Sequence, residues 1–347
     1  MKATVGAGLA LLLAFLLPLS GCASTRPAKP PLADRPAVQH FVNHMVERYH
    51  FDRAHLMALF GKVHIEPSII AAITRPAESK PWYQYRPIFV TRSRIDEGVR
   101  FWDAHAALLK RAQRKYGVAP EIIVAILGVE TRYGSHTGRY RVLDSLSTLA
   151  FDYPARAKFF RSELEQFLLL TRHEGVDPLT IKGSYAGAMG DPQFISSSYR
   201  RYAVDFNGDG KRDLWHSPSD VIGSVANYFH VHGWTPGAPI AARAKVTGDK
   251  YRALLDGGLK PHMSLSAMKG YGIEPQTPVQ GDPQATLLAL QNRNGEEYWL
   301  GMHNFYVITR YNHSPLYAMA VYQLGEAIRK ARDEQGVEAA DSAAHPR

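Results

Sequence analysis

An ionisable side chain, Glu130, lies within the apolar stretch ILGVETRYG. Around it, apolar residues recur at the spacing of one helical face: Ile122, Ile126, Val129 and Tyr133. A carboxyl group in such surroundings is partly desolvated, which disfavours its anion and raises its pKa toward about 6, a value that suits a general acid near neutral pH. The alternative is a glutamate exposed at a helix end or paired with Arg132. The local pattern leaves both interpretations open.

A second stretch, GSYAGAMGDPQFISSSY, combines glycines with polar side chains. Gly183, Gly187 and Gly190 allow the backbone to approach a ligand closely, because glycine carries no Cβ. Ser184 and Gln193 could hydrogen-bond a neutral, polyhydroxylated ligand. The same pattern is also typical of ordinary turns, in which these side chains would cap backbone groups.

An acidic loop, DFNGDGK, matches the first seven positions of a calcium-binding EF-hand loop, with oxygen ligands from Asp205, Asn207, Asp209 and the Lys211 carbonyl. Position 12 is His216, where a bidentate glutamate would normally close the coordination shell. The alternative is an Asx-rich turn that binds no metal.

The N-terminus predicts export. After Met1 and Lys2 comes GLALLLAFLLPL, which is too short to span a bilayer and is typical of a signal peptide over residues 1–21. Leu19-Ser20-Gly21-Cys22 has the pattern of a bacterial lipobox, so we expect Cys22, the sole cysteine, to be lipidated. Ala23 follows it, without an aspartate to favour the inner membrane, and this predicts the outer membrane.

These catalytic candidates must be positioned by a mainly α (α+β) fold. We expect a flexible tether at 22–36, a helical region at 37–100 in which ESKPWYQYRPIFV is an extended loop, and a helical core at 101–235 that contains the acidic loop 205–220. Between 236 and 304 the hydrophobic period changes toward two, which indicates a β-rich insertion. A C-terminal helical segment at 305–331 and a flexible tail at 332–347 complete the chain.

The chain of 347 residues has a net charge of +9, which favours an anionic partner such as a membrane surface or an acidic wall polymer. No motif for nucleotide or catalytic-zinc binding is present. An exported protein also meets no pool of ATP or NAD. We therefore expect no organic cofactor and no nucleic-acid partner.

Taken in order, ILGVETRYG, GSYAGAMG with PQF and SSY, NGDG with RDLW, VANYFHVHGW and ITRYNHS closely resemble the lytic murein transglycosylase B family, glycoside hydrolase family 103. The resemblance implies a lysozyme-like helical core and cleavage of the β-1,4 bond between MurNAc and GlcNAc of peptidoglycan. It implies that Glu130 is the single catalytic residue, first an acid and then a base, and that a 1,6-anhydro ring forms without water.

The resemblance also assigns substrate contacts to matching positions: Tyr85, Ser184, Gln193, Tyr228, Tyr311 and Asn312. Arg156 falls where the family often has paired arginines, but Ala155 replaces the first of them. Further departures are Asp191 and Ser196, the latter in place of a proline. For the acidic loop, the family closes its calcium site with a late aspartate, which here is Asp220, while Asp213 could contribute through water.

Three functions compete. A lytic transglycosylase would leave anhydro ends, a lysozyme-type hydrolase would use the same acid and admit water, and a non-catalytic lipoprotein would only bind the wall. The expected partners are peptidoglycan strands, the outer membrane through the lipid anchor, and other cell-wall enzymes. The expected location is the periplasmic face of the outer membrane.

Overall fold

The protein is described here as a computed structural model that covers residues 30–74 and 80–344. The predicted signal peptide, Cys22 and most of the tether lie outside the described residues. Helices dominate, as the sequence predicted, and the main α-helices are α1 Pro36–Tyr49, α2 Arg53–Phe60, α3 Pro67–Ile73, α4 Trp82–Phe89, α5 Arg92–Ala104, α6 Ala106–Tyr116, α7 Pro120–Thr131, α8 Val142–Asp152, α9 Ala157–Glu174, α10 Ser196–Tyr202, α11 Pro218–Val231, α13 His303–Ile308 and α14 Pro315–Ala344.

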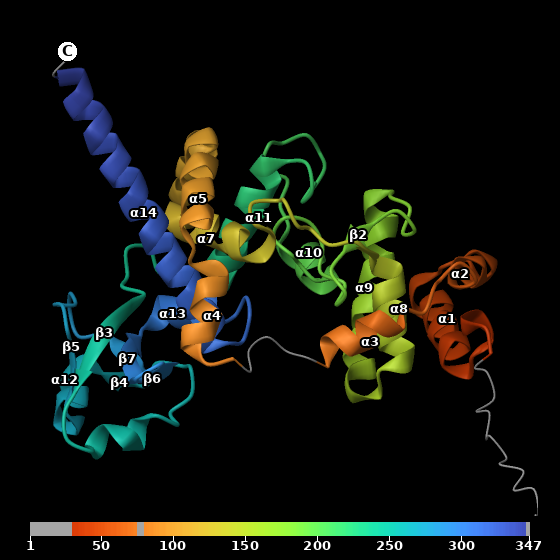
Figure 1. Cartoon of the computed structure of the whole chain (residues 1–347). Coiled ribbons are helices and arrows are strands. Elements are labelled where there is room, and N and C mark those ends of the chain that lie inside the picture. The colour runs from red at the N-terminus through yellow and green to blue at the C-terminus, as the bar shows by residue number, and fades with distance from the viewer. Residues whose placement is uncertain (1–29, 75–79, 345–347) are drawn as a thin grey trace, which may run out of the picture.

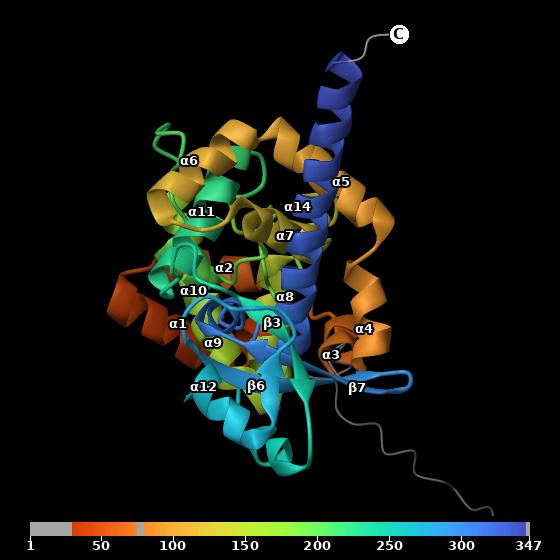
Figure 2. The same ribbon diagram turned by 90° about the vertical axis from the view of Figure 1, so that its left-hand side faces the viewer.

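The helices form one large core, into which α7 is almost fully buried. Pro120 opens α7, where its fixed φ and missing N–H are tolerated, and all residues from Ile122 to Val129 are buried. Helix α14 crosses α7 closely, because a Cβ at Gly325 would lie only 3.0 Å from the carbonyl oxygen of Glu121. Figure 2 shows α14 as a long helix standing beside α7 and α5. These contacts bring residues near 320 against residues near 125.

The predicted β-rich insertion is present and has its own small core. It forms an antiparallel five-stranded sheet in the order β4-β6-β7-β3-β5, whose strands are β3 Ala241–Val246, β4 Met263–Ser264, β5 Ile273–Pro275, β6 Gln284–Asn292 and β7 Gly295–Gly301. Short helical turns, among them α12 Leu265–Met268, connect the strands. In Figure 1 the insertion lies below α4 and α14, while α1 and α2 lie at the opposite end of the molecule.

The segment WYQYRPIF is helix α4, so the prediction of an extended loop was wrong. Pro81 precedes the helix, and Pro87 falls near its end, where each proline removes few helical hydrogen bonds. Trp82 and Tyr85 are both buried, and Phe89 packs on Tyr85 with ring centroids 5.1 Å apart. The aromatic residues therefore follow a helical period that the prolines obscured in the sequence.

The C-terminal tail also differs from the prediction, because α14 continues to Ala344 where a frayed tail was expected from residue 332. Pairs at i,i+4 spacing join Arg329 to Asp333 and Lys330 to Glu334 along this part of the helix. Such pairs add modest support to an exposed helix.

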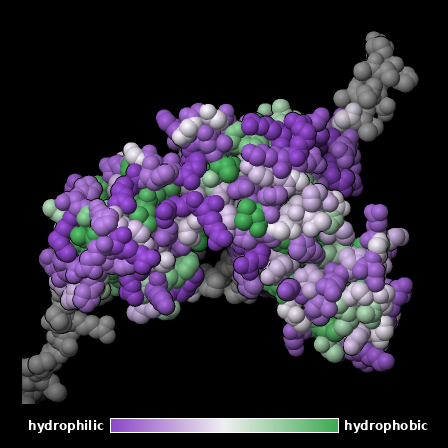
Figure 3. All heavy atoms as spheres, turned by 180° about the vertical axis from the view of Figure 1, so that it is seen from behind, coloured by the Kyte–Doolittle hydropathy of each residue, from purple (hydrophilic) through white to green (hydrophobic). Residues whose placement is uncertain are grey.

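A short antiparallel pair, β1 Tyr140–Arg141 and β2 Lys182–Gly183, positions the glycine-rich stretch beside the loop that follows α7. None of the helices in the described ranges combines the length and the apolar character needed to cross a bilayer. The face in Figure 3 is largely hydrophilic, with small separate hydrophobic patches.

Candidate active site

Glu130 occupies the last turn of α7 and is half-buried. Its Oε1 accepts a hydrogen bond of 2.5 Å from the Tyr317 hydroxyl at the start of α14. Arg132 does not pair with it, because the Arg132 guanidinium donates instead to both carboxylate oxygens of Glu97, at 2.6 and 2.5 Å. The prediction of a desolvated carboxyl group is therefore confirmed, and the alternative of an Arg132 pair is wrong.

The electrostatics of Glu130 are those of a group able to exchange a proton near neutral pH. Burial raises the pKa of Glu130 from 4.5 to about 7, and the hydrogen bond from Tyr317 opposes this rise because it stabilises the anion. Among the described residues, no other carboxyl group contributes to that shift. Glu130 is thus a lone acid in an environment that supports both of its protonation states.

Tyr317 is the residue that the sequence interpretation missed. It is 3% exposed, and burial together with the charge of Glu130 raises the pKa of its hydroxyl well above 10, so it remains a donor at working pH. In the sequence it is one aromatic residue in an amphipathic helical pattern. The available signal was its position six residues after Tyr311, in the same motif-bearing segment.

Two tyrosines that the sequence predicted as substrate contacts, Tyr228 and Tyr311, lie next to Tyr317. We call these three rings the tyrosine wall. The ring of Tyr311 stacks on Tyr317 with centroids 6.5 Å apart and an interplanar angle of 10°, and its hydroxyl donates to the Pro192 carbonyl. Tyr228 is buried and packs on Tyr311, with its hydroxyl donating to the Arg310 carbonyl. Both hydroxyls are committed to the backbone, so their rings are the parts that shape the site.

Tyr85 reaches the same region from α4. It is 2% exposed, and its electrostatic effect raises the pKa of Tyr317, which places it near the Tyr317 hydroxyl. Asn312 is half-buried directly after Tyr311. The structure thus brings residues from α4, α7, α11 and the start of α14 toward Glu130.

Ser184 and Gln193 have backbone partners. The Ser184 Oγ accepts from the N–H groups of Ala186 and Ala188, and so holds the glycine-rich turn. The Gln193 Nε2 donates to the carbonyls of Thr137 and Gly190. Each side chain can still make a hydrogen bond to a ligand, because the Ser184 hydroxyl can donate and the Gln193 Oε1 can accept.

Arg156 is exposed in the 3₁₀ turn η3 Pro154–Arg156 before α9. Its guanidinium packs over Phe159 at 4.4 Å and over Phe160 at 5.2 Å from the ring centroids. None of these contacts joins Arg156 to Glu130 or to the tyrosine wall.

The acidic loop brings three carboxylates together. Oxygen atoms of Asp205, Asp209 and Asp220 all lie within 4.8 Å of one another. Because calcium binds oxygen ligands at about 2.3–2.6 Å, a cluster of this span fits around a single ion. Asp220 is fully buried, comes from the first turn of α11, and also accepts from the N–H groups of Phe206 and Asp213.

The other predicted ligands are less well placed. The Asn207 side chain donates to Asp209 at 2.9 Å, which leaves its oxygen to accept from the Asp209 N–H. Asp213 accepts from the N–H groups of Trp215 and His216 and contacts the His216 ring, and its carboxylate is not part of the three-carboxylate cluster. The Lys211 N–H bonds to Asp209.

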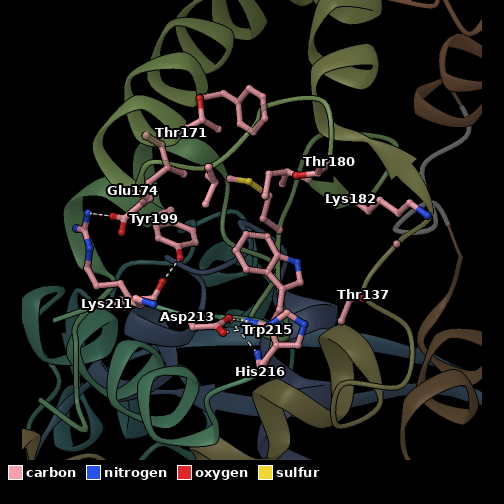
Figure 4. Close-up of a pocket in the computed structure, with 17 residues that line it drawn as sticks. Thr137, Thr171, Glu174, Thr180, Lys182, Tyr199, Lys211, Asp213, Trp215 and His216 are labelled. Carbon is pink, nitrogen blue, oxygen red and sulfur yellow. Dashed lines mark hydrogen bonds and ion pairs between the residues drawn. The ribbon is translucent and has the colours of Figure 1, made fainter. Parts of the chain in front are cut away.

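A cavity of about 490 Å³ lies between the end of α9, strand β2 and the acidic loop (Figure 4). Trp215 and Tyr199 line it together with Met189. Glu130 does not line it. Thr137, which accepts from Gln193, contributes to its wall and so connects this cavity to the glycine-rich stretch.

The sequence and the fold are similar to those of known bacterial murein transglycosylases. The family model described as "Transglycosylase SLT domain" matches residues 33–326. A membrane-bound lytic murein transglycosylase B of Escherichia coli is 46% identical over 310 residues, which cover 86% of this chain and 84% of the relative. The chain therefore belongs to the SLT-domain lytic transglycosylase family.

Solved structures agree. SltB1 of Pseudomonas aeruginosa has a TM-score of 0.82 at 51% identity, covering 86% of this chain and 99% of that one. The E. coli transglycosylase Slt35 in complex with calcium has a TM-score of 0.80 at 46% identity, covering 86% and 94%. SltB3 of P. aeruginosa, in complex with NAG-NAM-pentapeptide, has a TM-score of 0.75 at 32% identity, covering 84% and 79%. The predicted family and its mainly helical, lysozyme-like fold are confirmed.

Proposed function

We propose that this chain is a peptidoglycan lytic transglycosylase that cleaves the β-1,4 bond between MurNAc and GlcNAc and leaves 1,6-anhydroMurNAc ends. The observation that carries the proposal is Glu130, a partly enclosed carboxyl group whose pKa is raised to about 7 and whose hydrogen-bond partner is Tyr317. Ordinary glycosidases use two carboxyl groups. The family membership and the lone Glu130 together favour a reaction that needs one.

In the proposed first step, protonated Glu130 donates its proton to the glycosidic oxygen, and the bond between that oxygen and C1 of MurNAc breaks. The N-acetyl group of MurNAc stabilises the positive charge that develops at C1. The carboxylate left on Glu130 is stabilised by the Tyr317 hydroxyl, which donates to it.

In the second step, the Glu130 carboxylate takes the proton from the C6 hydroxyl of MurNAc, and O6 forms a bond to C1. This closes the anhydro ring and returns Glu130 to its acid form. Among the tyrosines near Glu130, Tyr311 is only half-buried, so its ring can offer a flat apolar face on which a sugar packs. Tyr85, Tyr228, Tyr311 and Asn312 are proposed to hold the substrate there, together with Ser184, Gln193 and Arg156 at its periphery.

Calcium is proposed as a structural ion in the acidic loop. Asp205, Asp209 and Asp220 would hold it, with oxygen atoms from Asn207, Lys211 and, through water, Asp213 completing the shell. A bound ion would offset the mutual repulsion of three carboxylates and so fix the loop against α11. The calcium complex of the E. coli relative supports this assignment.

For location, we infer an enzyme that is anchored through a lipidated Cys22 at the periplasmic face of the outer membrane, with residues 22–36 as its tether. The lipobox pattern and the membrane-bound E. coli relative support this assignment. Its macromolecular partner is peptidoglycan, in line with the muropeptide bound by SltB3, and other cell-wall enzymes are further proposed partners.

The experiment that tests the function compares Glu130→Gln with Glu121→Gln on purified sacculi. Glu121 is a matched control because it lies on the same helix, at the opposite end, and burial raises its pKa as well. We expect release of muropeptides to be abolished in Glu130→Gln and kept in Glu121→Gln. Normal release by Glu130→Gln would refute the assignment, and binding without release by the wild type would favour a non-catalytic wall-binding protein.

A further inference from the structure

Thr131, the residue after the proposed acid, has a buried hydroxyl with two backbone partners outside its own helical turn. Its Oγ1 donates to the Asp191 carbonyl at 2.9 Å and accepts from the Gly134 N–H at 3.0 Å. Thr131 is only 1% exposed. We propose that Thr131 is a positioning residue, whose hydroxyl fixes the last turn of α7 and thereby the location of the Glu130 carboxyl group.

The end of α7 needs such a restraint because its backbone geometry is unusual. Arg132, Tyr133 and Gly134 all have positive φ, at 51°, 58° and 85°. Left-handed conformations cost energy at residues other than glycine. The Thr131 Oγ1 accepts from the N–H of Gly134, the third of these residues, and so closes the left-handed turn that follows Glu130 and Thr131 in the chain.

The backbone around Asp191, whose carbonyl accepts from Thr131, is itself held by other hydrogen bonds. The Asp191 N–H donates to the Leu214 carbonyl at 2.8 Å, which ties this segment to the end of the acidic loop. The next carbonyl, that of Pro192, accepts from the Tyr311 hydroxyl at 2.6 Å. Thr131 therefore connects α7 to a backbone segment that is held from two other directions.

The consequence concerns the geometry of proton transfer. Glu130 is held from α14 by Tyr317, while Thr131 holds the backbone that carries it. Both restraints are needed for one carboxyl group to reach two different oxygen atoms of the substrate in succession. A displacement of about 1 Å at a reacting group can cost about 100-fold in rate. This inference rests on the proposed catalytic role of Glu130.

The test compares Thr131→Val, which keeps the shape and removes the hydroxyl, with Thr131→Ser, which keeps the hydroxyl. We expect kcat on solubilised peptidoglycan to fall about 10- to 100-fold in Thr131→Val with KM within about twofold. Thr131→Ser should stay within about threefold of the wild type in kcat. If Thr131→Val does not fold, Thr131→Ala removes the same hydroxyl without added bulk.

Thr148→Val is the matched control, because Thr148 is also buried and its Oγ1 accepts a backbone N–H, that of Glu66, at 3.1 Å. It should lower the melting temperature and leave kcat unchanged. The inference is overturned if Thr131→Val lowers the melting temperature but keeps wild-type kcat. If Thr131→Val keeps wild-type kcat while Glu130→Gln is inactive, only the positioning role of Thr131 is refuted. If Glu130→Gln is active, the proposed function itself is refuted.

Discussion

The hydrogen bond between Tyr317 and Glu130 has a measurable consequence for the pH dependence of activity. Because the Tyr317 hydroxyl donates to Glu130 Oε1, it stabilises the carboxylate over the carboxylic acid. Tyr317→Phe removes that donor and keeps the ring. The anion of Glu130 then loses its partner inside a largely desolvated site, so the pKa of Glu130 should rise further above its present value of about 7.

The magnitude follows from the strength of such bonds. A hydrogen bond to a charged group contributes about 1.5–3 kcal/mol, and one pKa unit corresponds to about 1.4 kcal/mol. The pKa of Glu130 should therefore rise by about one to two units. The free enzyme must carry the proton to begin the reaction, so kcat/KM is lost as pH rises through this pKa. The basic limb of the profile, near pH 7 in the wild type, should move up by the same amount.

The assay is the initial rate of sacculus solubilisation between about pH 5 and about pH 10, with folding checked by circular dichroism at each pH. Tyr322→Phe is the control, because Tyr322 lies on the same helix and its hydroxyl donates to the Ala241 carbonyl instead. Its profile should match that of the wild type. A basic limb that stays in place or moves to lower pH in Tyr317→Phe would show that the Tyr317 hydroxyl does not stabilise the Glu130 carboxylate.

Three further predictions concern stability. Because the pKa of Glu130 is raised in the folded state, the free energy of unfolding of the wild type should fall by up to about 3 kcal/mol as pH rises from 4.5 to 7. In urea unfolding, Glu130→Gln should therefore be the more stable protein above pH 7. The same pH dependence of unfolding free energy in both proteins would contradict this. A calcium chelator should lower the melting temperature of the wild type and leave that of Asp220→Asn unchanged, and an equal response would argue against the calcium site. Glu297 accepts a hydrogen bond from the indole N–H of Trp82, so Glu297→Leu should destabilise the protein by about 1–3 kcal/mol. Glu274 is exposed, and Glu274→Gln should have no effect on stability. Equal melting temperatures of the two variants would refute this.

The helix that carries Glu130 could be predicted from sequence, because its start signal and apolar spacing are local. Pro120 at the first position and the buried face both follow from residues within one segment. The insertion could be predicted for the same reason, since strands β3, β6 and β7 carry alternating or apolar patterns between turns. In contrast, the prolines of α4 masked a helical arrangement of aromatic residues.

The partners of Glu130 could not be predicted in this way. Tyr317 is 187 positions later in the chain, and it reaches Glu130 only because α14 crosses α7. The pairing of Arg132 with Glu97 likewise depends on how α5 packs beside α7. Local periodicity predicts that the Glu130 carboxyl group is desolvated. The tertiary packing decides which side chain donates a hydrogen bond to it.

We propose that one carboxyl group, that of Glu130, performs the whole reaction without water. The most direct measurement is mass spectrometry of muropeptides released from sacculi in water enriched in ¹⁸O. We expect products with anhydroMurNAc ends that carry no ¹⁸O. Reducing MurNAc ends labelled with ¹⁸O at C1 would instead show that water attacks, and would contradict it.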